Sequence, residues 1–226
     1  MPSLEALVQR VREDATYREP FDNAFGAGRP ITIDRIVAAI AAYERTLITP
    51  DAPYDRFVRG DASALSAAQL RGMELFQSVG CVQCHSGPNF SGASVFDKAP
   101  NTQRLFPVFA SQRYVERYRL TGDVGANVTG NKQGIWRIPS LRNVALTAPY
   151  FHNGSVDSLA EAVRIMATVQ RGKRVGASER EIVWSQQDRT LSRAGAEPVS
   201  ERDVQDIVAF LESLSSESLL ERSRKP

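Results

Sequence analysis

Residues 81–85 read Cys81-Val82-Gln83-Cys84-His85, and this pentapeptide holds both cysteines of the chain. The C-x-x-C-H pattern is the attachment signal for a c-type haem. Residues i, i+3 and i+4 of a helical turn share one face, so both thiols can form thioethers with one macrocycle while the imidazole of His85 reaches the iron. Two neighbouring cysteines argue against a disulfide framework, and a single further histidine, His152, argues against structural zinc. The pentapeptide therefore predicts one covalently attached haem c, in preference to a surface disulfide or a chance match.

The composition is that of an ordinary globular protein of 226 residues, with 42% hydrophobic and 24% charged residues, which excludes a disordered or fibrous chain. The formal net charge is +2, from 28 Lys and Arg against 26 Asp and Glu. Charge therefore gives no reason to expect a nucleic-acid partner. The sequence contains no run of 18 apolar residues, so we expect no membrane span.

Helical patterns surround the pentapeptide. Ser66 and Gln69 form a capping box that opens a helix, and Gly80 ends this helix directly before the pentapeptide. A turn-rich stretch over about residues 86–145 shows no helical period, and a long irregular segment of this kind can wrap the edge of a haem. Two further helices are expected over residues 32–47 and 200–214. The sequence thus predicts a mostly α protein with long irregular loops.

The sixth ligand of the iron has three candidates among the residues. Met73 lies on the core face of the helix before the pentapeptide, where packing is the better interpretation. Met166 lies on the apolar stripe of a second helix, which Ser158 caps and Leu159 begins. His152 can instead ligate the iron, act as an acid or base, or form a hydrogen bond within a tight turn. The residue pattern alone leaves Met166 and His152 as equal alternatives.

Two longer runs carry a family resemblance. Residues 138–155 read IPSLRNVALTAPYFHNGS, and residues 43–57 read YERTLITPDAPYDRF. Both runs, and their order around the C-x-x-C-H pentapeptide, resemble the bacterial di-haem cytochrome c peroxidase family. The resemblance covers about residues 20–214. It implies a cytochrome c-type haem domain that corresponds to the second, electron-receiving domain of that family.

The resemblance also implies roles for individual residues. His85 corresponds to the proximal iron ligand and Met166 to the distal one, whereas methylamine-utilisation relatives have a tyrosine at the second position. The family holds a calcium ion near its domain junction, partly through backbone carbonyls. These carbonyls correspond to Thr147 and Pro149, and oxygen ligands of this kind suit a hard cation.

The chain departs from the family in having one C-x-x-C-H motif, since the motif of the peroxidatic haem is missing. The basic, polar stretch 171–196 is longer than the family's usual link and is expected to be a solvated loop. Arg142 or Lys132 is a candidate partner of the haem propionates, the alternative being scattered surface charge. The expected organisation is a helical remnant of the family's first haem domain over residues 1–60, a cytochrome c domain over 61–215 and a frayed tail over 216–226.

The function that the resemblance implies is one-electron transfer through a His/Met haem c, in support of hydrogen peroxide reduction by a second haem. The implied partners are a small electron donor (a cytochrome c or a cupredoxin), a peroxidatic haem domain or subunit, and a second copy of the chain. Haem c is attached outside the bacterial cytoplasm, so the periplasm is expected. Residues 1–12 lack the apolar region of an export signal, and we expect the chain to be the downstream piece of a longer gene product.

Two alternatives remain at this point. The first is a self-standing mono-haem peroxidase, in which Met166 does not ligate the iron, one coordination position is open, and His152 serves as the acid or base. The second is a non-catalytic remnant that binds haem and a partner chain. The coordination of the iron distinguishes the first alternative from one-electron transfer, because an iron with both His and Met ligands transfers electrons whereas an iron with an open position can bind peroxide.

Overall fold

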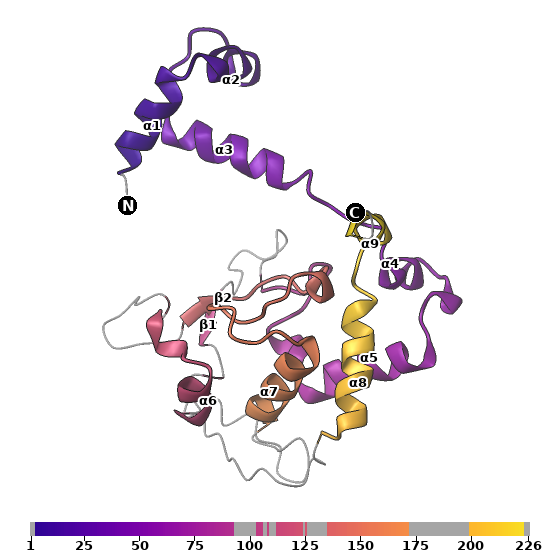
Figure 1. Ribbon diagram of the computed structural model, residues 1–226. Coiled ribbons are helices and arrows are strands. Elements are labelled where there is room, and N and C mark those ends of the chain that lie inside the picture. The colour runs from indigo at the N-terminus through magenta and orange to yellow at the C-terminus, as the bar shows by residue number, and fades with distance from the viewer. Residues whose placement is uncertain are drawn as a thin grey trace. The chain divides into compact units, whose positions relative to one another are not determined.

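The computed structural model describes residues 3–92, 103–105, 108, 112–123, 125, 135–171 and 199–223. The chain divides into two compact units, residues 1–49 and residues 50–226 (Figure 1). Among the described residues most secondary structure is helical, which confirms the prediction of a mostly α protein. No helix in this described part combines the length and the apolar character needed to cross a bilayer.

The first unit is a small group of helices. It contains α1 (Leu4–Glu13), η1 (Ala15–Tyr17), α2 (Arg18–Phe25) and α3 (Ile33–Glu44). The hydroxyl of Thr32 accepts a hydrogen bond from the Arg35 amide and so caps α3, as the sequence predicted. Within the unit, the Arg12 guanidinium donates to the Ile31 carbonyl oxygen at 2.9 Å and ties α1 to the chain just before α3.

The second unit contains the remaining elements. The first of them are α4 (Pro53–Val58), η2 (Ala62–Ala64), α5 (Ala67–Val79), η3 (Cys81–Gln83), β1 (Gln103–Leu105) and α6 (Gln112–Arg117). They are followed by η5 (Leu120–Gly122), β2 (Ile135–Arg137), η6 (Val144–Leu146), α7 (Leu159–Arg171), α8 (Glu201–Glu212) and α9 (Glu217–Ser223). Strands β1 and β2 form an antiparallel pair in which Arg104 lies opposite Trp136.

The crossing of α5 and α8 organises the core of this unit (Figure 1). Both helices begin with the predicted capping boxes, Ser66 with Gln69 and Ser200 with Asp203. Gly72 lies where the helices meet, since a Cβ atom built on it would stand 1.9 Å from the Asp206 carbonyl oxygen. The close approach therefore requires the absence of a side chain at this position.

Aromatic side chains fill the space beside this crossing. The rings of Phe76, Phe90 and Phe210 are buried and pack on one another with centroids 5.4 to 6.0 Å apart. Tyr54 from α4 joins them edge-on, with its centroid 5.0 Å from that of Phe90. A second cluster of buried side chains, which includes Tyr114, Leu120 and Ile165, packs α6 and η5 against α7.

Residues 50–58 belong by their contacts to the second unit, so the division lies earlier than the expected one at residue 60. The Tyr54 amide donates to the Ser213 carbonyl oxygen at 3.1 Å. The segment expected to be a frayed tail contains α9, and the buried Ser216 hydroxyl donates to Asp51 Oδ1 at 2.5 Å. An ion pair of 2.7 Å joins Arg56 to Glu217. These contacts fix the start of α9 against the segment that leads into α4.

Candidate haem site

A cavity of about 500 Å³ in the second unit collects the residues that the sequence singled out. Its walls come from α5, η3, β2 with the segment that follows it, α7 and α8. Most of the lining is aliphatic or aromatic. All seven candidate site residues line it: Cys81, Cys84, His85, Thr147, Pro149, His152 and Met166.

The C-x-x-C-H pentapeptide forms the helical turn that its spacing predicts. Gly80 ends α5 in the left-handed conformation, with φ 101°, and η3 follows at once. The amides of Cys84 and His85 both donate to the Cys81 carbonyl oxygen, at 3.2 and 2.9 Å. Both thiol-bearing residues are half-buried in this turn and line the cavity together with the imidazole.

The imidazole of His85 is held by a backbone carbonyl. Nδ1 lies 3.1 Å from the Phe90 carbonyl oxygen. Because a carbonyl oxygen can only accept, Nδ1 carries the proton and Nε2 keeps its lone pair, which is the tautomer that binds a metal through Nε2. Burial lowers the pKa of His85, while backbone hydrogen bonds at Phe90 and Pro139 act in the opposite direction. The balance favours the neutral ring.

Met166 reaches the cavity from α7, the helix that the sequence predicted from Ser158 onward. The amide of Glu161 donates to the Ser158 hydroxyl at 3.4 Å, at the start of this helix. An ion pair between Arg164 and Glu201, with N–O distances of 2.8 and 2.9 Å, joins α7 to α8. The Tyr118 hydroxyl donates to Glu161 at 2.8 Å, and burial together with this carboxylate raises the pKa of Tyr118. Met166 therefore lies on a helix that is anchored on two sides.

His152 lines the same cavity and stacks on Trp136. The ring centroids are 4.3 Å apart and the planes make an angle of 18°. The neighbouring Asn153 amide donates to the carbonyl oxygens of Tyr118 and Arg119, at 2.8 and 3.2 Å. Sequence reasoning missed the Trp136–His152 stack, since the two residues lie on different elements.

Thr147 and Pro149 line the cavity beside Tyr150, whose hydroxyl donates to the Val144 carbonyl oxygen at 3.1 Å. Within the described ranges, no group of three or more His, Cys, Asp or Glu side chains comes together as a metal site. A calcium ion bound partly by the carbonyls of Thr147 and Pro149 stays a prediction.

Arg142, a candidate partner of the haem propionates in the sequence analysis, is not among the residues that line this cavity. Arg142 lines a second cavity of about 480 Å³, together with residues of the loop after His85, and its guanidinium pairs with Asp55. Met73 also lines that second cavity and packs against the aromatic core, which agrees with its interpretation as a packing residue. Lys132 and residues 172–196 lie outside the described residues.

The main cavity fits a haem in its volume and in its chemistry. Its volume lies within the range of about 300–1,000 Å³ that is typical of ligand and cofactor pockets. Apolar walls suit a macrocycle, and two thiols, an imidazole and a thioether are the groups that haem c attachment and ligation use. Trp136 Nε1 is buried with no hydrogen-bond partner among the described residues. A bound group with a carboxylate would supply an acceptor of the kind this donor requires.

Comparison with known proteins gives consistent results. A family model described as di-haem cytochrome c peroxidase matches residues 1–63. The chain is 37% identical to cytochrome c551 peroxidase of Pseudomonas aeruginosa over 203 residues, which are 88% of this chain and 49% of that protein. It is 31% identical to the methylamine utilization protein MauG of Methylorubrum extorquens over 223 residues, 95% of this chain and 54% of the relative.

A solved structure agrees with these relatives. The crystal structure of a MauG-like protein associated with microbial copper homeostasis superposes with a TM-score of 0.61 at 30% identity, covering 96% of this chain and 63% of that one. The cytochrome c-type helical fold predicted from the sequence is thereby confirmed. The chain spans about half the length of the curated relatives it matches. With both the fold and the sequence in agreement, the chain belongs to the di-haem cytochrome c peroxidase family.

Proposed function

We propose that this chain binds one haem c through Cys81 and Cys84, with His85 and Met166 as iron ligands, and that it transfers single electrons. The observation that carries the proposal is the common cavity, in which both thiols, the imidazole and the thioether line one largely apolar space. A His/Met ligand pair would raise the reduction potential of the haem, which suits electron transfer. The haem, when bound, supplies the one-electron couple.

The residues of the chain perform three tasks in this function. The thiols fix the macrocycle covalently, and the Phe90 carbonyl orients His85 through Nδ1 so that Nε2 is available to the iron. The apolar side chains of α7 and α8 keep water from the site, which preserves a low dielectric around the redox centre.

The wider role is part of the same proposal. Electrons would enter from a small cytochrome c or cupredoxin in the periplasm and pass to a peroxidatic haem on another domain or subunit, where hydrogen peroxide is reduced to water. Two relatives are named as peroxidases, and the chain covers about half of each. The absence of a second C-x-x-C-H motif from these 226 residues supports a role as the electron-transfer part of a peroxidase. A calcium ion at Thr147 and Pro149 and a homodimer belong to the proposal as further elements.

The ferric absorption spectrum of the holoprotein tests the ligand set. We expect the weak long-wavelength band of sulfur-ligated low-spin haem c, its loss in Met166→Ala, and its retention in Met73→Leu. Met73 is the matched control, because it is the other methionine beside the core but lines the other cavity. A band that survives in M166A would contradict the assignment of Met166.

A self-standing mono-haem peroxidase is the second candidate, because His152 lines the same cavity and is stacked on Trp136. In that case the wild-type ferric spectrum is high-spin and shifts on addition of peroxide or cyanide. Peroxide turnover by the isolated chain would then fall in His152→Gln. If the chain instead transfers electrons with Met166 as an iron ligand, peroxide turnover by the wild type is low and rises in M166A, because that substitution opens a coordination position.

A further inference from the structure

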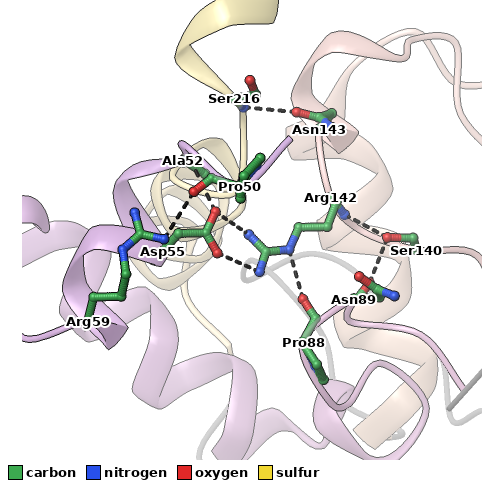
Figure 2. A network of polar contacts seen from close by, with 10 residues as sticks. All are labelled: Pro50, Ala52, Asp55, Arg59, Pro88, Asn89, Ser140, Arg142, Asn143 and Ser216. Atoms are coloured by element: carbon green, nitrogen blue, oxygen red, sulfur yellow. Dashed lines mark hydrogen bonds and ion pairs between the residues drawn. The ribbon is translucent and has the colours of Figure 1, made fainter. Parts of the chain in front are cut away.

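The loop that follows the proximal histidine, residues 86–90, is held by three consecutive residues of a distant segment. Figure 2 shows two of these contacts, those of Ser140 with Asn89 and of Arg142 with Pro88. Arg142 Nε donates to the Pro88 carbonyl oxygen at 2.8 Å, the Ser140 hydroxyl donates to that of Asn89 at 2.6 Å, and the Leu141 amide donates to that of Phe90 at 3.3 Å. Three successive carbonyl groups of the loop thus each accept a hydrogen bond from one of the residues 140–142.

The last of these carbonyls is the one that holds His85. The Phe90 oxygen accepts from Nδ1 of His85 and from the Leu141 amide, which uses both of its lone pairs. Phe90 has a φ of +48°, a left-handed conformation that a residue with a side chain adopts only where its surroundings enforce it. The orientation of the imidazole therefore depends on contacts that keep the loop in this shape.

Arg142 is itself fixed from several directions. Its guanidinium forms a two-pronged ion pair with Asp55, with N–O distances of 2.8 and 3.0 Å, and both side chains are largely buried, at 18% and 14% exposed. Asp55 also accepts the Ala52 amide at 3.2 Å, so it is locked at the start of α4. The guanidinium carbon lies 5.5 Å from the ring centroids of both Tyr54 and Phe90.

From these contacts we infer that Arg142, with Ser140, is a positioning residue for His85. The inference rests on the proposed function and deepens it. The guanidinium, anchored on Asp55, holds the loop so that the Phe90 carbonyl keeps its hydrogen bond to Nδ1. This bond makes the imidazole a more basic ligand, which stabilises the ferric state. Loosening the loop would therefore raise the reduction potential of the haem.

The direction of the change in reduction potential distinguishes the loss of this support from the loss of a nearby charge. Removal of a positive charge near a haem favours the ferric state and so lowers the potential. Loss of the loop anchor raises it. Arg142→Lys keeps the charge but cannot reproduce the planar fork. Ser140→Ala leaves the charge unchanged and removes two hydrogen bonds of its hydroxyl, the one it donates to the Asn89 carbonyl oxygen and the one it accepts from the Arg142 amide.

The control is Arg71→Met. Arg71 forms an equivalent two-pronged pair with Asp206, with both N–O distances at 2.9 Å, on the α5–α8 crossing. In the described structure this pair has no hydrogen bond to the 86–90 loop. R71M therefore removes a guanidinium, its charge and an ion pair, a larger change than R142K makes, without disturbing the contacts that hold the histidine.

The experiment uses the haem-loaded chain of 226 residues and two readouts, the reduction potential and the rate at which the His85 Nδ1 proton exchanges with D₂O by NMR. In R142K we expect faster exchange and a one-electron equilibrium shifted about tenfold toward reduction, which is about 59 mV. S140A should move both readouts in the same direction by less. R71M should leave the exchange rate at the wild-type value.

Two results would overturn the inference. Unchanged potential and exchange in both R142K and S140A would show that the loop does not need these anchors, and equal changes in R71M would show a general loss of rigidity. S140A keeps the test decisive if the Arg142 variant does not fold. A wild-type spectrum without His85 ligation would instead refute the proposed function itself, and it is recorded before any variant.

Discussion

Substitution of Gly72 by alanine should destabilise the second unit because α5 and α8 meet at this residue. A Cβ atom there would lie 1.9 Å from the Asp206 carbonyl oxygen and 2.8 Å from Cβ of Phe210, where ordinary contact begins at 3.4 Å. The nearest atom belongs to the backbone of a helix, so it cannot rotate away. The helices must separate by about 1.5 Å, a gap large enough to forfeit a quarter or more of the dispersion energy at each contact.

The magnitude follows from two opposing effects. Alanine is favoured over glycine in a helix by about 1 kcal/mol. Overpacking typically costs about 1–3 kcal/mol and occasionally more, and a clash with backbone justifies about 4 kcal/mol here. The net loss is therefore about 3 kcal/mol, which lowers the Tm of a domain of this size by about 6–12 °C.

Thermal unfolding of the haem-loaded protein, followed by circular dichroism, measures this loss. Gly122→Ala is the matched control, because a Cβ atom at Gly122 would meet nothing within 4 Å. Its Tm should stay at the wild-type value. A G72A protein as stable as the wild type, or more stable, would refute the argument that the missing side chain sets the distance between the two helices.

Three further predictions concern the polar contacts of the same unit. Arg71 lowers the folded-state pKa of the buried Asp206 from its ordinary value of 3.8. The ionised carboxylate therefore stabilises the fold above pH 3.8, and this contribution is lost as the pH falls through the lower, folded-state pKa. Urea titrations should show a smaller loss of stability on acidification in R71M than in the wild type. Ser216→Ala leaves Asp51 without its buried hydroxyl donor and should cost about 1–3 kcal/mol, with faster proteolysis near α9. Tyr118→Phe removes the hydrogen bond to Glu161 and should lower the stability by about 1 kcal/mol, seen as a Tm drop of about 2–4 °C.

The parts of the fold that the sequence predicted correctly are those encoded by neighbouring residues. The capping box of Ser66 and Gln69 and the terminal Gly80 act within one helix, so their pattern is visible in the sequence and α5 begins and ends as predicted. The helical turn at residues 81–85 is local in the same way. The cavity also collects the seven candidate residues. The residue pattern made candidates of the pentapeptide, Met166 and His152, whereas Thr147 and Pro149 came from the family resemblance alone.

The parts that could not be predicted depend on residues far apart in the chain. The partner of Arg142 is Asp55, 87 positions away, and that of Arg71 is Asp206, 135 positions away. The sequence made Arg142 a candidate partner of an anionic ligand, whereas in the structure its guanidinium pairs with the carboxylate of Asp55. Similarly, the polar composition after Leu214 indicated a frayed end, whereas the Ser216 hydroxyl is buried against Asp51.

Residues 136–152 contribute side chains to both cavities. Trp136, Pro139, Pro149 and His152 face the main cavity, while Arg142 turns to the other side and holds the loop behind His85. One segment therefore contributes a wall of the haem site and supports the proximal ligand from outside it. A substitution in this segment acts on the candidate haem in two ways, through contact and through the imidazole. Because Arg142 lines only the second cavity, an altered potential in R142K with an unchanged Met166 band would assign its effect to the support of His85.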